Sequence, residues 1–216
     1  MRLIYNMKFR KFFSTLSALF LLAGQITPVF AGDWYIEDGN ITVNSGDNGQ
    51  TVTQGAQAPV EDDNPVITQR DSDIPSGNSV TVNAEANNDA NVTIKNLNID
   101  TTGGNTAAVT TGGSGNVNVE LNGNNTLQSA DGRAGVEKTG NGTLTINDAD
   151  NNGSLSATGG ENAAGIGGGI ADPSRNININ GGNITAEGGD GGAGIGGGDG
   201  ENGSNINING GNVTAT

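Results

Sequence analysis

Short runs of alternating apolar and polar residues recur along most of the chain. The clearest is "NININ", at 176–180 and again at 205–209, with isoleucines on one face and asparagines on the other. Weaker runs of the same kind are "NVTIKNLNI" at 91–99, "NVNVEL" at 116–121 and "TLTIN" at 143–147. Strict alternation is the period of a β-strand, and the Gly, Asn and Asp residues between the runs favour turns. The pattern therefore predicts many short strands.

Two sequence segments repeat residue for residue at an offset of 29 positions. "AGIGGG" occurs at 164–169 and 193–198, and "NININGGN" at 176–183 and 205–212. Earlier copies are degenerate, with steps of 25, 27, 33 and 29 residues if the equivalent positions are Val92, Val117, Leu144, Ile177 and Ile206. A period in this range is typical of a solenoid. We therefore expect an all-β protein, a parallel β-helix (β-solenoid) with coils of about 25–33 residues and the right-handed crossover that parallel connections prefer.

Each coil would contribute three strands, placed in the best copy near 177–179, 184–186 and 193–195. Coils stacked about 4.8 Å apart would fill a narrow interior with aliphatic side chains and line up asparagines outside. The predicted aliphatic pairs are Ile177 with Ile206, Ile184 with Val213, and Ile166 with Ile195. A propeller blade would be longer, and a sandwich would show hairpins without exact repetition.

The first 31 residues differ from the rest. Four basic residues lie within the first eleven, an apolar run follows from Phe12 to about Ala23, and the small Ala31 precedes "GDW". This is the pattern of a secretory signal peptide, and the apolar run is shorter than a membrane span requires. We expect a secreted or cell-surface protein with no membrane insertion after removal of residues 1–31.

The remaining chain divides into two parts. Residues 32–78 are interpreted as an N-terminal cap with the first irregular coils, with Trp34 and Tyr35 covering the first coil. Residues 79–216 are interpreted as regular coils. Because "GGNVTAT" lies inside a repeat copy, we expect a truncated C-terminus and further modules of the same polypeptide.

The net charge of the chain limits the kinds of partner that it can bind. Without residues 1–31 the chain loses four of its nine basic residues and none of its 23 acidic ones, which leaves a net charge of −18. Such a protein should repel nucleic acid and anionic lipid. It should attract cations, or acidic polymers if cations bridge the two. The absence of Cys rules out disulfides.

The segment "GGDGGAGIGGGDGENG" at 188–203 partly matches two ligand-binding motifs. It fits G-x-G-x-x-G, but no helix follows to receive a phosphate. It also approaches a calcium nonapeptide, but Ala193 stands where Asp is needed and the period is wrong. The segment is interpreted as a wall and corner of one coil, with Ile195 pointing inward.

Calcium remains a candidate cofactor because acidic turns offer the oxygen ligands that it prefers. The alternative interpretation is that these turns only solvate the surface. The candidate metal ligands are Asp148, Asp150, Asp190, Asp199 and Glu201.

The sequence offers little for catalysis. It contains no His, and beyond residue 31 its basic residues are scattered, with Arg133 and Lys138 as the only close pair. We therefore expect a non-enzymatic protein, with a polysaccharide lyase or hydrolase as the minor alternative.

The run "LTINDADNNGSLSATGGENAAGIGGG" and the later "NININGGNITAEGGDGGAGIGGG" carry a family resemblance. Over about residues 79–216 the chain resembles secreted parallel β-helix surface proteins of Gram-positive bacteria, which are described as adhesin-like or as containing carbohydrate-binding domains. The resemblance implies binding to a polysaccharide or a host or cell-surface glycan, and some relatives are similar to calcium-dependent binders of acidic plant polysaccharide, but it implies no individual site residue. The expected function is an adhesion or polysaccharide-binding module; the alternative is a structural stalk for other modules.

Overall fold

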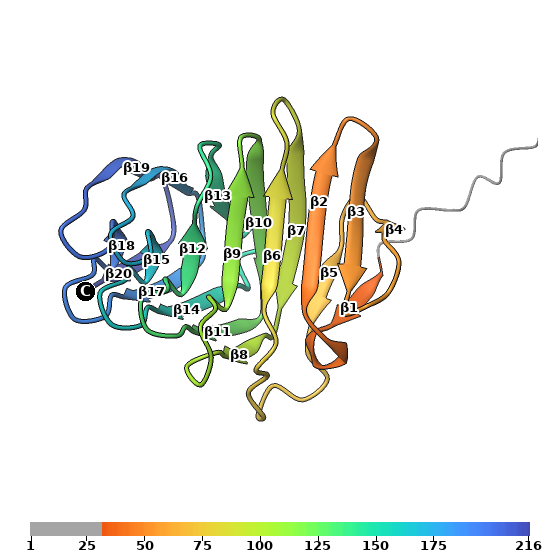
Figure 1. The fold of residues 1–216 in the computed structure, drawn as a ribbon, viewed down its shortest axis with the longest axis horizontal. Helices are drawn as coiled ribbons and strands as arrows, with labels where there is room; N and C mark the ends of the chain where they lie inside the picture. The colour runs from red at the N-terminus through yellow and green to blue at the C-terminus, as the bar shows by residue number, and fades with distance from the viewer. Residues whose placement is uncertain (1–31) are drawn as a thin grey trace, which may run out of the picture.

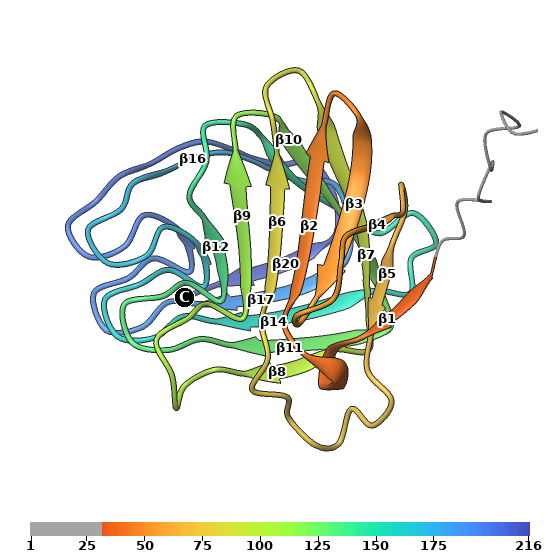
Figure 2. The same cartoon turned by 45° about the vertical axis from the view of Figure 1, so that its right-hand side comes forward.

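The chain winds into a three-sided β-solenoid. The structure is a computed structural model that describes residues 32–216, so the predicted signal peptide lies outside the described residues. Successive coils each add one strand to three sheets, which run along the length of the molecule (Figures 1 and 2). The predicted all-β parallel β-helix is confirmed.

The three sheets, named A, B and C, differ in length and regularity. Sheet A contains, in spatial order, β1 (Asp33–Tyr35), β5 (Val66–Thr68), β7 (Asp89–Lys95), β10 (Asn116–Asn122), β13 (Leu144–Asn147), β16 (Ser174–Ile179) and β19 (Gly203–Ile208). Sheet C contains β8 (Asn98–Asp100), β11 (Asn124–Gln128), β14 (Ser154–Thr158), β17 (Asn183–Glu187) and β20 (Asn212–Ala215). Sheet B contains β4 (Val60–Glu61), β3 (Gly49–Gln54), β2 (Ile41–Gly46), β6 (Val80–Ala84), β9 (Val109–Gly113), β12 (Val136–Lys138), β15 (Ile166–Gly167) and β18 (Ile195–Gly196).

The register between coils confirms the predicted aliphatic pairs. Strand pairing aligns Ile177 with Ile206, Ile184 with Val213, and Ile166 with Ile195. One assignment is wrong: Val117 pairs with Ala90, while Val92 pairs with Val119. A shift of two residues keeps the same side chains facing inward, so the alternating pattern alone does not fix the register.

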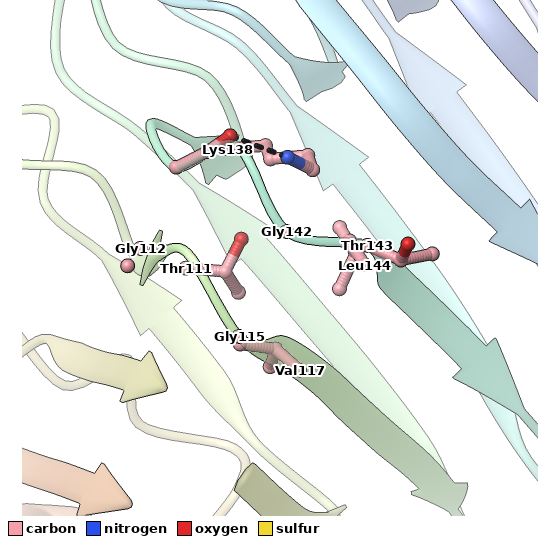
Figure 3. A pocket seen from close by; sticks show the side chains of 10 residues that line it. Thr111, Gly112, Gly115, Val117, Lys138, Gly142, Thr143 and Leu144 are labelled. Carbon is pink, nitrogen blue, oxygen red and sulfur yellow. Dashed lines mark hydrogen bonds between the residues drawn. The ribbon is translucent and has the colours of Figure 1, made fainter. Parts of the chain in front are cut away.

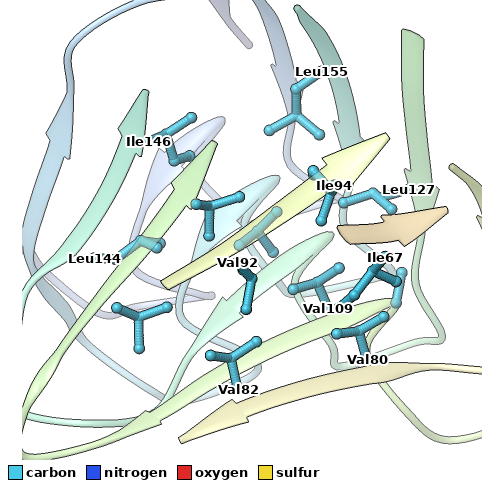
Figure 4. Close-up of a cluster of buried hydrophobic side chains, with 14 of the residues drawn as sticks. Ile67, Val80, Val82, Val92, Ile94, Val109, Leu127, Leu144, Ile146 and Leu155 are labelled. Carbon is cyan, nitrogen blue, oxygen red and sulfur yellow. The ribbon is translucent and has the colours of Figure 1, made fainter. Parts of the chain in front are cut away.

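Aliphatic side chains from all three sheets fill the interior. Buried examples are Ile94 and Leu144 on sheet A, Val109 on sheet B, and Leu127 and Leu155 on sheet C, all of which point into the interior (Figure 4). Because the interior is narrow and each coil needs only a few such residues, an apolar content of 32% is enough to build a continuous core.

The N-terminal end is closed by a cap with a different strand pattern. β2 and β3 form an antiparallel hairpin, and the two-residue β4 pairs antiparallel to β3. Trp34 packs against the core, and its indole N–H donates to Oδ2 of Asp62 at 2.8 Å. Gln50 bonds to the backbone N–H and C=O groups of Asn91 in the next layer. Because the edge strand β4 is short and acidic, it discourages further strand pairing at this end of sheet B.

The loop between β5 and β6 is fastened to this cap. Arg70 donates two hydrogen bonds to the carboxylate of Asp38, at 2.8 and 2.6 Å, and lies 4.1 Å from the centre of the Tyr35 ring. The same hydrogen bonds hold the pKa of Asp38 below its usual value. Beyond Tyr35, the 3-10 helix η1 (Ile36–Asp38) leads into β2.

The glycine-rich segment 188–203 forms a corner where neighbouring coils touch through their backbones. A Cβ on Gly189 would lie 1.9 Å from the carbonyl oxygen of Gly160, and one on Gly160 would lie 2.1 Å from that of Ala130. β18 lies within this segment, and its Ile195 packs against the core as expected. The glycines are therefore required by the close approach of stacked coils.

Replacing Gly189 by Ala should test this close approach. We expect Gly189→Ala to destabilise the fold by about 1–3 kcal/mol, because backbone and not a flexible side chain opposes the new methyl group. The matched control is Gly103→Ala, whose Cβ would meet nothing within 4 Å. Urea denaturation measures both, and equal stability of the two variants would contradict the prediction.

Candidate functional site

The structure brings two of the five predicted metal ligands together and adds a third carboxylate. Asp148 and Asp150 lie in the turn after β13, and Glu120 lies on β10 of the preceding coil. One carboxylate oxygen from each residue lies within 4.8 Å of the others. Within residues 32–216 this is the one such group of three or more potential metal ligands. Asp190, Asp199 and Glu201 lie exposed at other turns and are not part of it.

The turn that carries Asp148 and Asp150 is an insertion into the repeat. Leu144 pairs with Ile177, and Leu155 pairs with Ile184. The sequence separation is thus 11 residues in one coil and 7 in the next. The four extra residues account for the unusual step of 33 against 29. This turn therefore adds a feature that stacking of coils does not require.

Hydrogen bonds shape the turn around its carboxylates. Oδ1 of Asp148 accepts from the backbone N–H groups of Asn152 and Gly153, both at 3.0 Å. Oε1 of Glu120 accepts from the N–H of Ala149, which ties the turn to the neighbouring coil. Hard cations such as calcium take six to eight oxygen ligands. Three carboxylates would supply part of such a set, with water or a hydroxylated ligand supplying the rest.

A shallow groove lies beside this acidic turn on the outer face of sheet A. Its volume is about 280 Å³, and its lining comes from three adjacent strands and the segment before β5. Glu120 belongs to both the groove and the carboxylate group. The polar residues that line the groove are Asn64, Asn91, Thr93, Asn118, Glu120 and Asn147.

Side-chain amides in the groove are held by hydrogen bonds between coils. Nδ2 of Asn118 donates to Oδ1 of Asn91 at 3.0 Å, and Nδ2 of Asn180 donates to Oδ1 of Asn147 at 2.9 Å. The predicted asparagine ladders are therefore confirmed. Each bonded amide still has one N–H and one oxygen lone pair to offer a ligand.

A second hollow, of about 460 Å³, lies beside β2, β6 and β9 where sheet B turns toward sheet A. Its polar lining residues include Asn44, Asn83, Glu85 and Ser114. No residue of the three-carboxylate group lines it. The groove on sheet A is therefore the stronger candidate site.

Lys138 lies in the interior beside a small cavity (Figure 3). The cavity has a volume of about 10 Å³, which is near the minimum for one water molecule. Nζ of Lys138 donates to the carbonyl oxygen of Gly140 at 2.6 Å, and no carboxylate lines the cavity. Burial lowers the pKa of Lys138, and the positive charge of Arg175 lowers it further.

Arg133 and Lys138, the close basic pair of residues 32–216, point to different sides of β12. Arg133 donates to Oε1 of the buried Glu137 at 3.1 Å, while Lys138, the next residue along β12, points inward. Burial raises the pKa of Glu137, and the nearby Arg133 offsets part of this effect. The ion pair closes the outside of β12, on the other side of the strand from the cavity.

Comparisons with known proteins do not assign the chain to a family. No protein-family model, no curated protein and no solved structure matches the chain significantly. Within residues 32–216, no helix has the length and apolar character needed to cross a membrane.

The lowered pKa of Lys138 predicts that the stability of the fold depends on pH. Its folded-state pKa is lowered, so the unfolded chain binds more protons as the pH approaches 10.5, and stability from this group rises with pH. We expect Lys138→Met to gain about 1 kcal/mol near pH 7, because a charge no longer has to be buried, and to gain less near pH 10.

The measurement is urea denaturation at several pH values, with the less buried Lys95→Met as control. A gain from Lys138→Met that stays constant between pH 7 and pH 10 would contradict the assignment.

Proposed function

We propose that this protein is an extracellular β-solenoid that binds polysaccharide on the outer face of sheet A. The observation that carries the proposal is the groove of about 280 Å³ lined by ordered amides, with Glu120 at the point where it meets the inserted acidic turn. The signal-peptide pattern of residues 1–31 supports the extracellular or cell-surface location.

The chemistry of the groove suits sugar hydroxyls. Each hydroxyl donates and accepts a hydrogen bond, and each asparagine amide does the same. The two aromatic residues of the described chain are poorly placed for stacking on a sugar ring. Trp34 packs against the core and bonds to Asp62, and Arg70 covers the ring of Tyr35. Recognition would therefore be polar, by amides that need little reordering on binding.

Calcium fits this proposal as a cofactor at the inserted turn. Glu120, Asp148 and Asp150 would provide anionic oxygens, and hydroxyls of a sugar lying in the adjoining groove would complete the coordination. The shared residue Glu120 would couple the two sites. Asp190, Asp199 and Glu201 do not join this group, so the proposal does not extend to them.

Binding can be tested with a glycan array, with calcium and with chelator. We expect at least one polysaccharide to be retained and Asn118→Ala to weaken its binding by about fivefold, the equivalent of one hydrogen bond. The control is Asn212→Ala, which removes the amide bond to Asn183 on sheet C. An array with no binding in either condition would leave a structural stalk as the better interpretation.

The calcium site makes a separate prediction about stability. Calcium should raise the melting temperature of the protein, because an ion bound only by the folded state stabilises it by about 2.7 kcal/mol at one hundred times its dissociation constant. Asp148→Asn should abolish the rise while keeping the oxygen that accepts from Asn152 and Gly153. Asp190→Asn should leave the rise intact. A melting temperature that calcium and chelator leave unchanged would refute the site.

A further inference from the structure

We infer that the bound polysaccharide is a neutral, linear chain that lies along the solenoid axis, across the strands of sheet A. This inference rests on the proposed function and specifies its ligand. It follows from three observations: the alignment of polar side chains from coil to coil, the bonds between them, and the charge around them.

Polar side chains on the outside of sheet A form rows that cross β7, β10, β13, β16 and β19. Strand register places the members of the first row, here called the central row, opposite one another in successive coils. The central row consists of Asn91, Asn118, Thr145, Asn178 and Asn207. A parallel row, the edge row, follows from the same register and from the amide bonds. The edge row consists of Thr93, Glu120, Asn147, Asn180 and Asn209.

The groove is the start of these rows and not an isolated pocket. Its lining includes the first two residues of the central row and the first three of the edge row. Beyond the groove, the rows continue over β16 and β19 with the same chemistry. Asn207 donates to Asn178 at 2.9 Å, and Asn209 donates to Asn180 at 2.9 Å. A ligand in the groove can therefore extend onto further ordered amides without leaving sheet A.

The spacing of the rows favours a regular polymer. Adjacent strands lie about 4.8 Å apart, so five strands span about 19 Å. One pyranose unit of an extended β-linked chain advances by nearly the same distance as one strand. Successive sugars would thus meet equivalent polar positions, most of them amides with at least one N–H and one lone pair free. A branched or terminal sugar would use only one or two of these positions.

The charge around the rows favours a neutral chain. Glu120 lies within the edge row, Asp148 and Asp150 lie next to it, and Asp89 pairs with Asn116 beside the central row. One calcium ion would balance only two of the three carboxylate charges at the inserted turn, so a polymer of uronic acids would still meet net negative charge there and a strongly negative protein. A neutral glycan would meet no such repulsion and could still place hydroxyls on the calcium ion and on the amides.

Isothermal titration calorimetry with a ladder of oligosaccharides tests the inference. The probes are β-1,4-linked glucose and xylose oligomers from disaccharide to hexasaccharide, with oligogalacturonate as the acidic comparison. All titrations are made in the presence of calcium. We expect affinity for a neutral series to rise roughly two- to tenfold with each added sugar until the rows are filled, which corresponds to about one hydrogen bond per unit.

A double variant tests which residues produce the gain in affinity with oligosaccharide length. Asn178→Ala combined with Asn207→Ala removes the far part of the central row, so it should weaken hexasaccharide binding much more than disaccharide binding and flatten the dependence on length. The matched control is Asn183→Ala combined with Asn212→Ala, which removes an equivalent amide pair from sheet C. Melting curves of both variants check that each remains folded.

The outcomes separate this inference from the proposed function. Equal affinity for disaccharide and hexasaccharide, or binding only of oligogalacturonate, overturns the axial neutral ligand but leaves polysaccharide binding in place. So does a glycan array that is positive only for branched or terminal sugars. A rise with length that the sheet C control abolishes as strongly as the sheet A variant also overturns it. An array with no binding overturns both.

Discussion

Parallel hydrogen bonding between successive coils is the constraint on which this structure depends. Each strand pairs through its backbone with the strands of the coils above and below, so equivalent residues are brought about 4.8 Å apart. A side chain at any position must then be compatible with the same position in the next coil. Isoleucine on isoleucine is favourable inside, where Ile177 lies opposite Ile206, and asparagine on asparagine is favourable outside, where the two amides can bond to each other.

The same constraint explains the glycines and the low aromatic content. At the corners the backbones of adjacent coils nearly touch, and only glycine leaves room, as at Gly189 over Gly160. The narrow interior accepts small aliphatic residues in layers. The bulky Trp34 and Tyr35 lie at the capped end, where the hairpin β2–β3 interrupts the parallel stacking. Stability is therefore distributed along the axis, with the cap closing one end.

Two features of the molecule depart from the repeat. The four-residue insertion after β13 goes beyond the length that the next coil uses, and it brings Asp148 and Asp150 to Glu120 and adjoins the groove. Lys138 is a departure of another kind, a cation in the interior with a single carbonyl partner. The first is consistent with a binding site on sheet A. The second costs stability near neutral pH, and the surrounding aliphatic layers have to offset that cost.

The sequence by itself determined the fold class, the coil length and the pairing of the most regular coils, because exact repetition leaves one way to stack Ile166 on Ile195 or Ile184 on Val213. It also pointed to Asp148 and Asp150 as acidic turn residues. Only the tertiary structure decided that Val117 faces Ala90 and that Glu120 completes the carboxylate group. A two-residue alternation looks the same after a shift of two, so side chains from different coils become neighbours only once backbone pairing has set the register.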